Sequence, residues 1–120
     1  MKKALLASVI SALLFSNAFA KEKKVEPAHL ASPSQYELLL ENDEVFVLKM
    51  TLKPGEQDNW HKHNAETVYF EKGGKATITT SDKDMTLEIP DGYVMWHDQW
   101  EHQVKNVGDT TITAIIVEKK

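Results

Sequence analysis

Short runs of β-branched and aromatic residues limit the possible fold of this chain more than any other feature. From Tyr36 onward these runs alternate with turn residues about every ten positions, which is typical of an all-β sandwich or barrel. In the clearest run, 45–52, every second residue is a large apolar one, so these residues share one face of a strand: Phe46, Leu48, Met50 and Leu52. The pattern predicts a small antiparallel β-barrel or sandwich without long amphipathic helices.

Three other segments predict local structure. The sequence Lys72-Gly73-Gly74 separates two strand-like runs and predicts a β-hairpin, because glycine accepts the positive backbone angles of a tight turn. The run 85–89 alternates, with Met85, Leu87 and Ile89 expected inside. The run 37–40 fits either a helical turn or a strand.

The first twenty residues have the pattern of a secretory signal peptide. A positive start at Lys2 and Lys3 precedes the apolar run 4–15 and the small-residue sequence Ala18-Phe19-Ala20. The apolar run is shorter than the roughly 20 residues of a membrane-spanning helix. We therefore expect residues 1–20 to be removed by cleavage after Ala20, and the protein to be secreted or periplasmic.

The remaining chain is long enough for one domain. Residues 21–34 are charged and interrupted by Pro27 and Pro33, which predicts a flexible, exposed N-terminal lead-in with His29 as a solvated surface residue. Residues 35–120 then form the single domain.

Composition excludes several classes of function. The formal net charge is −4, and loss of Lys2 and Lys3 makes it more negative, so neither nucleic acid nor an acidic membrane surface is an expected partner. The chain has no cysteine, which excludes disulfides and thiolate catalysis. It also has no arginine, so an acidic substrate would have to be held by lysine or by a metal.

Three potential metal ligands lie close together in the sequence, namely His61, His63 and Glu66. Imidazole nitrogens and a carboxylate oxygen suit one divalent transition metal, such as Fe, Mn, Zn, Ni or Cu, better than they suit calcium. His61 and His63 are two residues apart, so an extended strand would direct both rings to one side. Spacing alone leaves open the alternative that all three side chains lie on a solvated loop.

A second stretch, 90–106, adds a further pattern. Together, the stretches 55–73 and 90–106 resemble the two sequence signatures of the cupin superfamily. The matching residues are Gly55, His61, His63, Glu66 and Gly73 in the first, and Gly92, His102 and Asn106 in the second. Each signature is one residue short, before Glu66 and before His102, and Asp98 and Trp100 replace the usual proline and glycine.

The resemblance spans about residues 40–118 and is greatest to small, exported, single-domain cupins. It implies a jelly-roll β-barrel that holds one metal ion through four ligands and leaves positions open for water or substrate: His61, His63, Glu66 and His102. Because cupins often dimerise, a homodimer is a further expectation. Trp60 and Trp100 are expected as pocket walls and His97 as a supporting residue beside the ligands. Trp96 is expected in the core.

Two functions fit these residues. One is a metal-dependent enzyme of dioxygenase or isomerase type, acting on a small oxygenated molecule, with Glu66 as a ligand or a catalytic base. The other is a non-catalytic exported module that binds a metal or a small ligand. The sequence assigns no further catalytic residue.

Overall fold

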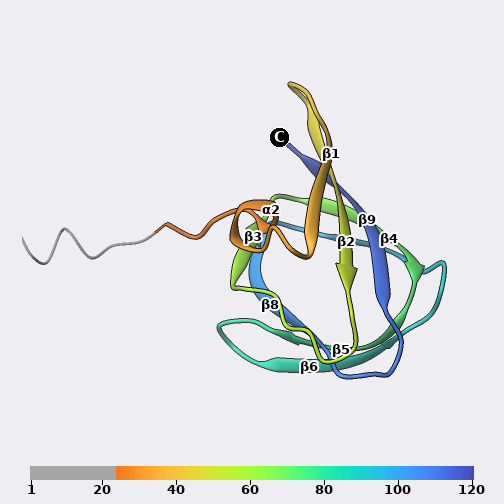
Figure 1. Ribbon diagram of the computed structural model, residues 1–120. Helices are drawn as coiled ribbons and strands as arrows, with labels where there is room; N and C mark the ends of the chain where they lie inside the picture. Colours follow the sequence, from red (N-terminus) through yellow and green to blue (C-terminus); the bar gives the residue numbers. More distant parts are fainter. Residues whose placement is uncertain (1–23) are drawn as a thin grey trace, which may run out of the picture.

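The computed structural model describes residues 24–120 (Figure 1). The predicted signal peptide and its cleavage point lie outside the described residues. Within the described part, no helix is both long enough and apolar enough to span a membrane.

The described residues form two antiparallel sheets and one short helix. The five-stranded sheet has the order β1-β2-β9-β4-β7, and the four-stranded sheet has the order β3-β8-β5-β6. The elements are α2 (Ala28–Ala31), β1 (Tyr36–Glu41), β2 (Val45–Leu52), β3 (His61–His63), β4 (Glu66–Lys72), β5 (Gly74–Thr79), β6 (Asp84–Ile89), β7 (Val94–His97), β8 (Trp100–Asn106) and β9 (Ile112–Lys119). The predicted small antiparallel β-barrel is therefore confirmed, and residues 37–40 lie in a strand.

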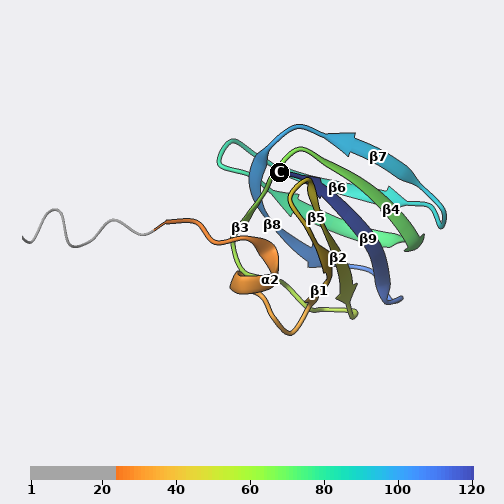
Figure 2. The ribbon, with the colours of Figure 1, turned by 90° about the horizontal axis from the view of Figure 1, so that it is seen from above.

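The hydrophobic core lies between the two sheets (Figure 2). Strand β2 contributes Leu48, Met50 and Leu52, which are the inward residues predicted from its alternation. Strand β9 pairs with β2 along its whole length, from Val45 opposite Lys119 to Leu52 opposite Ile112. Because side chains alternate along a strand, this pairing directs the even-numbered residues of β9 into the same interior.

The predicted hairpin at Gly73 and Gly74 is wrong. Strand β4 pairs with β7 and β9, whereas β5 pairs with β6 and β8, so the chain crosses from one sheet to the other at these glycines. The crossing is very close: a Cβ atom on Gly73 would lie 1.8 Å from the carbonyl oxygen of Ile89. Glycine is required here for the close approach of two backbones rather than for a turn.

The predicted lead-in is also wrong from Glu26 onward. The carbonyl of Glu26 accepts a hydrogen bond from the amide of Lys62 in β3, at 3.0 Å. Ala28 is fully buried, and Ser32 Oγ accepts a hydrogen bond from the amide of Asn59, at 2.8 Å. Helix α2 lies beside β3 in both views of the molecule (Figure 1, Figure 2). A helix this short is stabilised by its tertiary contacts, which local sequence does not reveal.

Three smaller expectations also differ from the structure. His29, expected in solvent, is half-buried with its ring 5.9 Å from that of Phe46. Trp96, expected in the core, is 58% exposed, and Leu87, expected inside, is 43% exposed. Trp96 lies on the outer face of β7, where Val94 is also exposed while Met95 and His97 are half-buried, and Leu87 lies on the edge strand β6, which has a neighbouring strand on one side only.

Candidate metal centre

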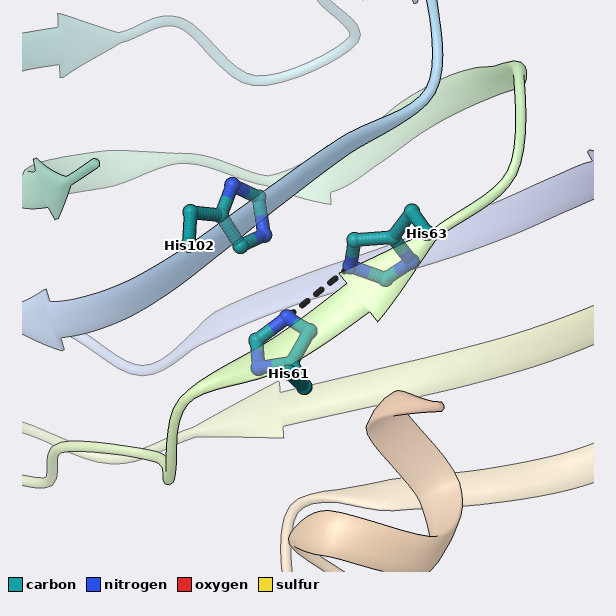
Figure 3. Close-up of side chains that lie close together, drawn as sticks. All are labelled: His61, His63 and His102. Carbon is teal, nitrogen blue, oxygen red and sulfur yellow. Dashed lines mark hydrogen bonds between the residues drawn. The ribbon is translucent and has the colours of Figure 1, made fainter. Parts of the chain in front are cut away.

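Three histidines converge inside the barrel, as predicted. His61 and His63 come from β3, and His102 comes from the adjacent strand β8, where it pairs with His61 (Figure 3). All three side chains are buried, and their ring centroids lie 4.7 to 5.0 Å apart. One nitrogen from each ring can be chosen so that the three atoms lie within 4.8 Å of one another.

Hydrogen bonds orient two of the rings. His61 Nδ1 lies 2.7 Å from the carbonyl oxygen of Asn59, and His63 Nδ1 lies 2.9 Å from Glu118 Oε2. A carbonyl can only accept a hydrogen bond, and so can an ionised carboxylate. The proton of His61 therefore lies on Nδ1, and so does that of His63 when Glu118 is ionised; both Nε2 atoms then present lone pairs.

The two Nε2 atoms face each other at 3.0 Å (Figure 3). A proton on one Nε2 makes this contact a hydrogen bond, whereas with both protons on Nδ1 the two lone pairs repel unless a cation lies between them. Two donors about 2.1 Å from a metal are about 3.0 Å apart at the right angles of an octahedral site and about 3.4 Å apart in a tetrahedral site. The spacing therefore fits two ligands of one metal ion.

His102 provides a separate indication of a cation. Both of its ring nitrogens are buried and have no hydrogen-bond partner within residues 24–120. An unpaired polar group inside a protein is costly, and a bond from one nitrogen to a metal would remove that cost. The donor set present at this position thus fits a divalent transition metal.

Glu66 lies beside this group of nitrogens, on the other edge of the His63 ring. Its Oε2 is 3.1 Å from His63 Nδ1, and its Oε1 accepts a hydrogen bond from Trp100 Nε1 at 3.1 Å. The three-histidine group does not include it. Its role as a metal ligand stays a prediction.

Glu118 belongs to the site but was not predicted from the sequence. It is 1% exposed, and its Oε1 accepts a hydrogen bond from the amide of Asn64 at 2.7 Å. It shares the inward parity of strand β9 with three buried apolar residues, Ile112, Ala114 and Ile116. A glutamate on the interior face of a strand was the signal that could have found it.

Asp58, also not predicted, supports the site from the side of His61. Its Oδ2 accepts a hydrogen bond from the Tyr36 hydroxyl at 2.6 Å, and its Oδ1 accepts one from the amide of Val104 at 2.7 Å. Oδ2 also lies 3.7 Å from His61 Nδ1. The ring of Tyr36 contacts the rings of both His61 and His63, so the Tyr36–Asp58 pair helps to fix the position of these two histidines.

Burial determines the protonation of the site. Burial, reinforced by the neighbouring histidines, lowers the pKa of His63 to about 3 and that of His102 to about 2. Burial also raises the pKa of Glu66 to about 8 and that of Glu118 to about 7. Near neutral pH the imidazoles of His63 and His102 are therefore uncharged, which is the form that binds metals.

These shifts predict how the stability of the metal-free protein depends on pH. Because the histidine pKa values are lowered in the folded state, the neutral rings make their full contribution to stability above pH 6.5, the ordinary histidine pKa. This contribution is lost as the pH falls towards 3. Because the carboxyl pKa values are raised in the folded state, the protonated groups make their full contribution to stability below pH 4.5, the ordinary glutamate pKa. This contribution is lost as the pH rises towards 8. Chelator-treated protein should therefore have its highest melting temperature between pH 4.5 and 6.5.

The variant Glu66→Gln tests which group causes the fall in melting temperature above pH 6.5. Glu66→Gln cannot ionise, so its melting temperature should fall less than that of the wild type between pH 6.5 and 8. Equal slopes for the two proteins would contradict the assignment to Glu66. Scanning fluorimetry of both proteins in a constant ionic-strength buffer series makes the comparison.

Beside the three histidines lies a small cavity of about 50 Å³. His63, Glu66 and His102 lie in its wall, and most of the remaining lining is apolar, including Phe70 and Ala114. No lysine lines it. The cavity can therefore hold a small molecule that is largely apolar.

The predicted supporting residues lie on the outer side of this cavity. Trp100 lines it, and the ring of His97 stacks on Trp100 with centroids 3.5 Å apart. The other side of Trp100 faces an open groove, which Trp60 also lines and where Trp60 Nε1 lies 3.4 Å from Glu101 Oε1. Trp100 thus lies between the cavity and the groove. His97 is not part of the three-histidine group.

No family model matches the sequence, and no match is found among curated proteins. The fold, in contrast, has many solved counterparts. A cupin domain from Bordetella pertussis Tohama I has a TM-score of 0.66 and 23% identity, over 82% of this chain and 99% of that one. An RmlC-like cupin with a double-stranded β-helix fold from Methanocaldococcus jannaschii has a TM-score of 0.56 and 19% identity, over 82% of this chain and 91% of that one.

A third counterpart is a predicted oxalate decarboxylase from Thermotoga maritima. Its TM-score is 0.50 and its identity is 24%, over 71% of this chain and 79% of that one. With both sheets antiparallel, these likenesses define the class of fold as a jelly-roll barrel. The chain has the cupin fold, as its two sequence signatures predicted.

Proposed function

We propose that this chain is a metal-dependent enzyme that acts on a small, largely apolar oxygenated molecule. One divalent transition metal would be held by His61, His63 and His102. The observation that carries the proposal is the convergence of three buried imidazole rings, two of which, His63 and His102, lie with Glu66 in the wall of an apolar cavity. Three protein ligands leave coordination positions open, as catalytic sites require.

Each residue of the site has a distinct part in this proposal. The metal would supply Lewis-acid or redox chemistry towards an oxygen of the substrate. Asn59 and Glu118 hold the rings of His61 and His63 in the orientation that directs Nε2 inward. Glu66 is placed to accept or return a proton at Oε2, which has no hydrogen-bond partner within residues 24–120.

The cavity lining restricts the substrate. A substrate anion would find no lysine from the described residues 24–120 there, and its charge would have to be balanced by the metal. Neutral ketones, enols and alcohols fit this lining better than dicarboxylates do. We also propose export of the protein, on the evidence of the signal-peptide pattern in residues 1–20.

Metal analysis tests the centre itself. Protein purified without chelator should retain a transition metal, and adding Fe, Mn, Ni, Cu or Zn to the stripped protein should raise its melting temperature. Less than roughly a tenth of an equivalent of metal, together with no thermal shift, would reject the centre. Stable metal binding without turnover of any small neutral oxygenated compound would favour the non-catalytic binding module.

Filling the cavity should block the substrate while sparing the metal. Ala114 is fully buried in the cavity wall, and Ala114→Val adds two carbon atoms to a space of about 50 Å³. We expect metal content to stay the same and the affinity of the Co²⁺-loaded protein for acetohydroxamic acid to fall at least about tenfold, equivalent to about 1.4 kcal/mol. A visible-absorbance titration measures this affinity.

A valine outside the cavity serves as the control. Ala31→Val lies at the end of helix α2 and should leave the acetohydroxamic acid affinity unchanged. If Ala114→Val binds this probe as tightly as the wild type, small ligands reach the metal by another route.

A further inference from the structure

A second group of potential ligands surrounds the opposite edge of the His63 ring. Glu118 Oε2 is 2.9 Å from His63 Nδ1, and Glu66 Oε2 is 3.1 Å from the same nitrogen. The three atoms lie within 4.8 Å of one another, and all three side chains are at most 2% exposed. This group uses Nδ1 of His63, whereas the three-histidine centre uses Nε2.

The two carboxyl groups are held so that one oxygen of each faces His63. Trp100 Nε1 donates to Oε1 of Glu66, and the amide of Asn64 donates to Oε1 of Glu118. The pairing of β4 with β9 sets Glu66 directly opposite Glu118. Both Oε2 atoms are thus directed at one nitrogen by contacts on the far side of each carboxyl group.

One proton on Nδ1 cannot satisfy both oxygens. It forms a hydrogen bond with Glu118, and Glu66 Oε2 is left buried without a hydrogen-bond partner within residues 24–120. When both carboxyl groups are ionised they repel each other inside the protein, and removing each charge from water is costly. A cation bound to both would remove the repulsion and satisfy the unpartnered oxygen.

We propose that His63 Nδ1, Glu66 Oε2 and Glu118 Oε2 form a second divalent metal site; with that site filled, Glu66 Oε2 is a metal ligand and not the proton acceptor of the proposed reaction. Ligands about 2.1 Å from a metal lie about 3.0 Å apart at the right angles of an octahedral site, close to the observed 2.9 and 3.1 Å, and about 3.4 Å apart in a tetrahedral site. One imidazole nitrogen and two carboxylate oxygens suit Zn²⁺ or Mn²⁺. His63 then bridges two metals as an imidazolate, and its Nδ1 proton is released to solvent when the second ion binds.

Zinc stoichiometry tests the proposal on the chelator-treated full chain. Wild-type protein should bind two Zn²⁺ ions, with proton release on the second. Glu66→Gln and Glu118→Gln, which keep the shape of each side chain, should each bind one. His102→Ala should bind one at the second site, and His63→Ala should bind none. Glu37→Gln, on an exposed residue of β1, is the matched control and should bind two.

Other zinc stoichiometries distinguish a failure of the second site from a failure of the three-histidine centre. If the wild type binds one ion that both glutamine variants keep and His102→Ala loses, the second site is rejected and the three-histidine centre stands. If the wild type binds one ion that Glu118→Gln loses and His102→Ala keeps, the second site stands alone. If the wild type binds none, both are rejected. Circular dichroism of every variant confirms that it is folded.

Copper gives a spectroscopic test of the bridge. Two Cu²⁺ ions joined by one imidazolate couple magnetically, so the EPR signal per copper should fall as the second equivalent binds. In Glu118→Gln, one copper should give a full, uncoupled signal. An EPR signal that doubles with the second equivalent in the wild type would show that His63 does not join the two ions.

Discussion

His102→Ala is expected to lower the affinity of the three-histidine centre for its metal at least about a hundredfold. At a metal concentration well above the wild-type Kd, this loss reduces the stabilisation by metal by about 2.7 kcal/mol. For a domain of this size, the metal-induced rise in melting temperature should shrink by roughly 10 °C. Thermal melts with and without Zn²⁺, and metal content after desalting, measure both effects.

The metal-free form of the same variant should behave differently. Both nitrogens of His102 are buried and unpartnered within residues 24–120, so alanine removes a costly polar group together with its packing. We therefore expect the melting temperature of the stripped protein to change much less than that of the metal-loaded protein. His29→Ala, outside the cluster, is the control and should leave the metal-induced shift unchanged. An equal loss in both forms would show that His102 acts in packing alone.

The histidines of the centre could be predicted because their spacing is local. His61 and His63 lie two apart on one strand, so alternation alone directs both rings to one side. His102 could be added through the order of the two cupin signatures. Its pairing with His61 across β3 and β8 then explains how residues so distant in sequence meet.

Glu118 and Asp58 could not be found in this way, because neither belongs to a recognised signature. Glu118 lies 55 residues from His63 and reaches it only because β9 lies beside β4. Which strands become neighbours depends on the long-range packing of both sheets, and local residue patterns do not encode it. The alternation of β9 did place a glutamate on the inner face, and that was the available clue.

The two errors in the fold have related causes. Pro27 and Pro33 indicated an irregular lead-in, yet Ala28 and Ser32 are buried there by contacts with distant segments. The sequence Lys72-Gly73-Gly74 has the composition of a hairpin turn, but its strands belong to different sheets. In both places, tertiary contacts decide between conformations that the local sequence allows.

The chain passes from one sheet to the other at Gly73, and adding a single methyl group there, as in Gly73→Ala, should cause a large loss of stability. In Gly73→Ala, the new Cβ would lie 1.8 Å from the carbonyl oxygen of Ile89 and 2.8 Å from the carbonyl carbon of Pro90. Both contacts are with backbone, so no side chain can rotate away and the two segments must separate. We expect the free energy of unfolding to fall by at least about 3 kcal/mol, measured by urea denaturation of the metal-free protein.

Gly55→Ala separates this steric effect from the cost of glycine's backbone freedom. Gly55 has a φ of 81°, and a methyl group added to it would meet no other atom within 4 Å, so alanine there costs only conformational strain, about 1 kcal/mol. The difference between the two variants therefore measures the close approach of β4 to the end of β6. If Gly73→Ala were no more destabilising than Gly55→Ala, the backbone at Gly73 would have room to move, and the crossing would not require glycine.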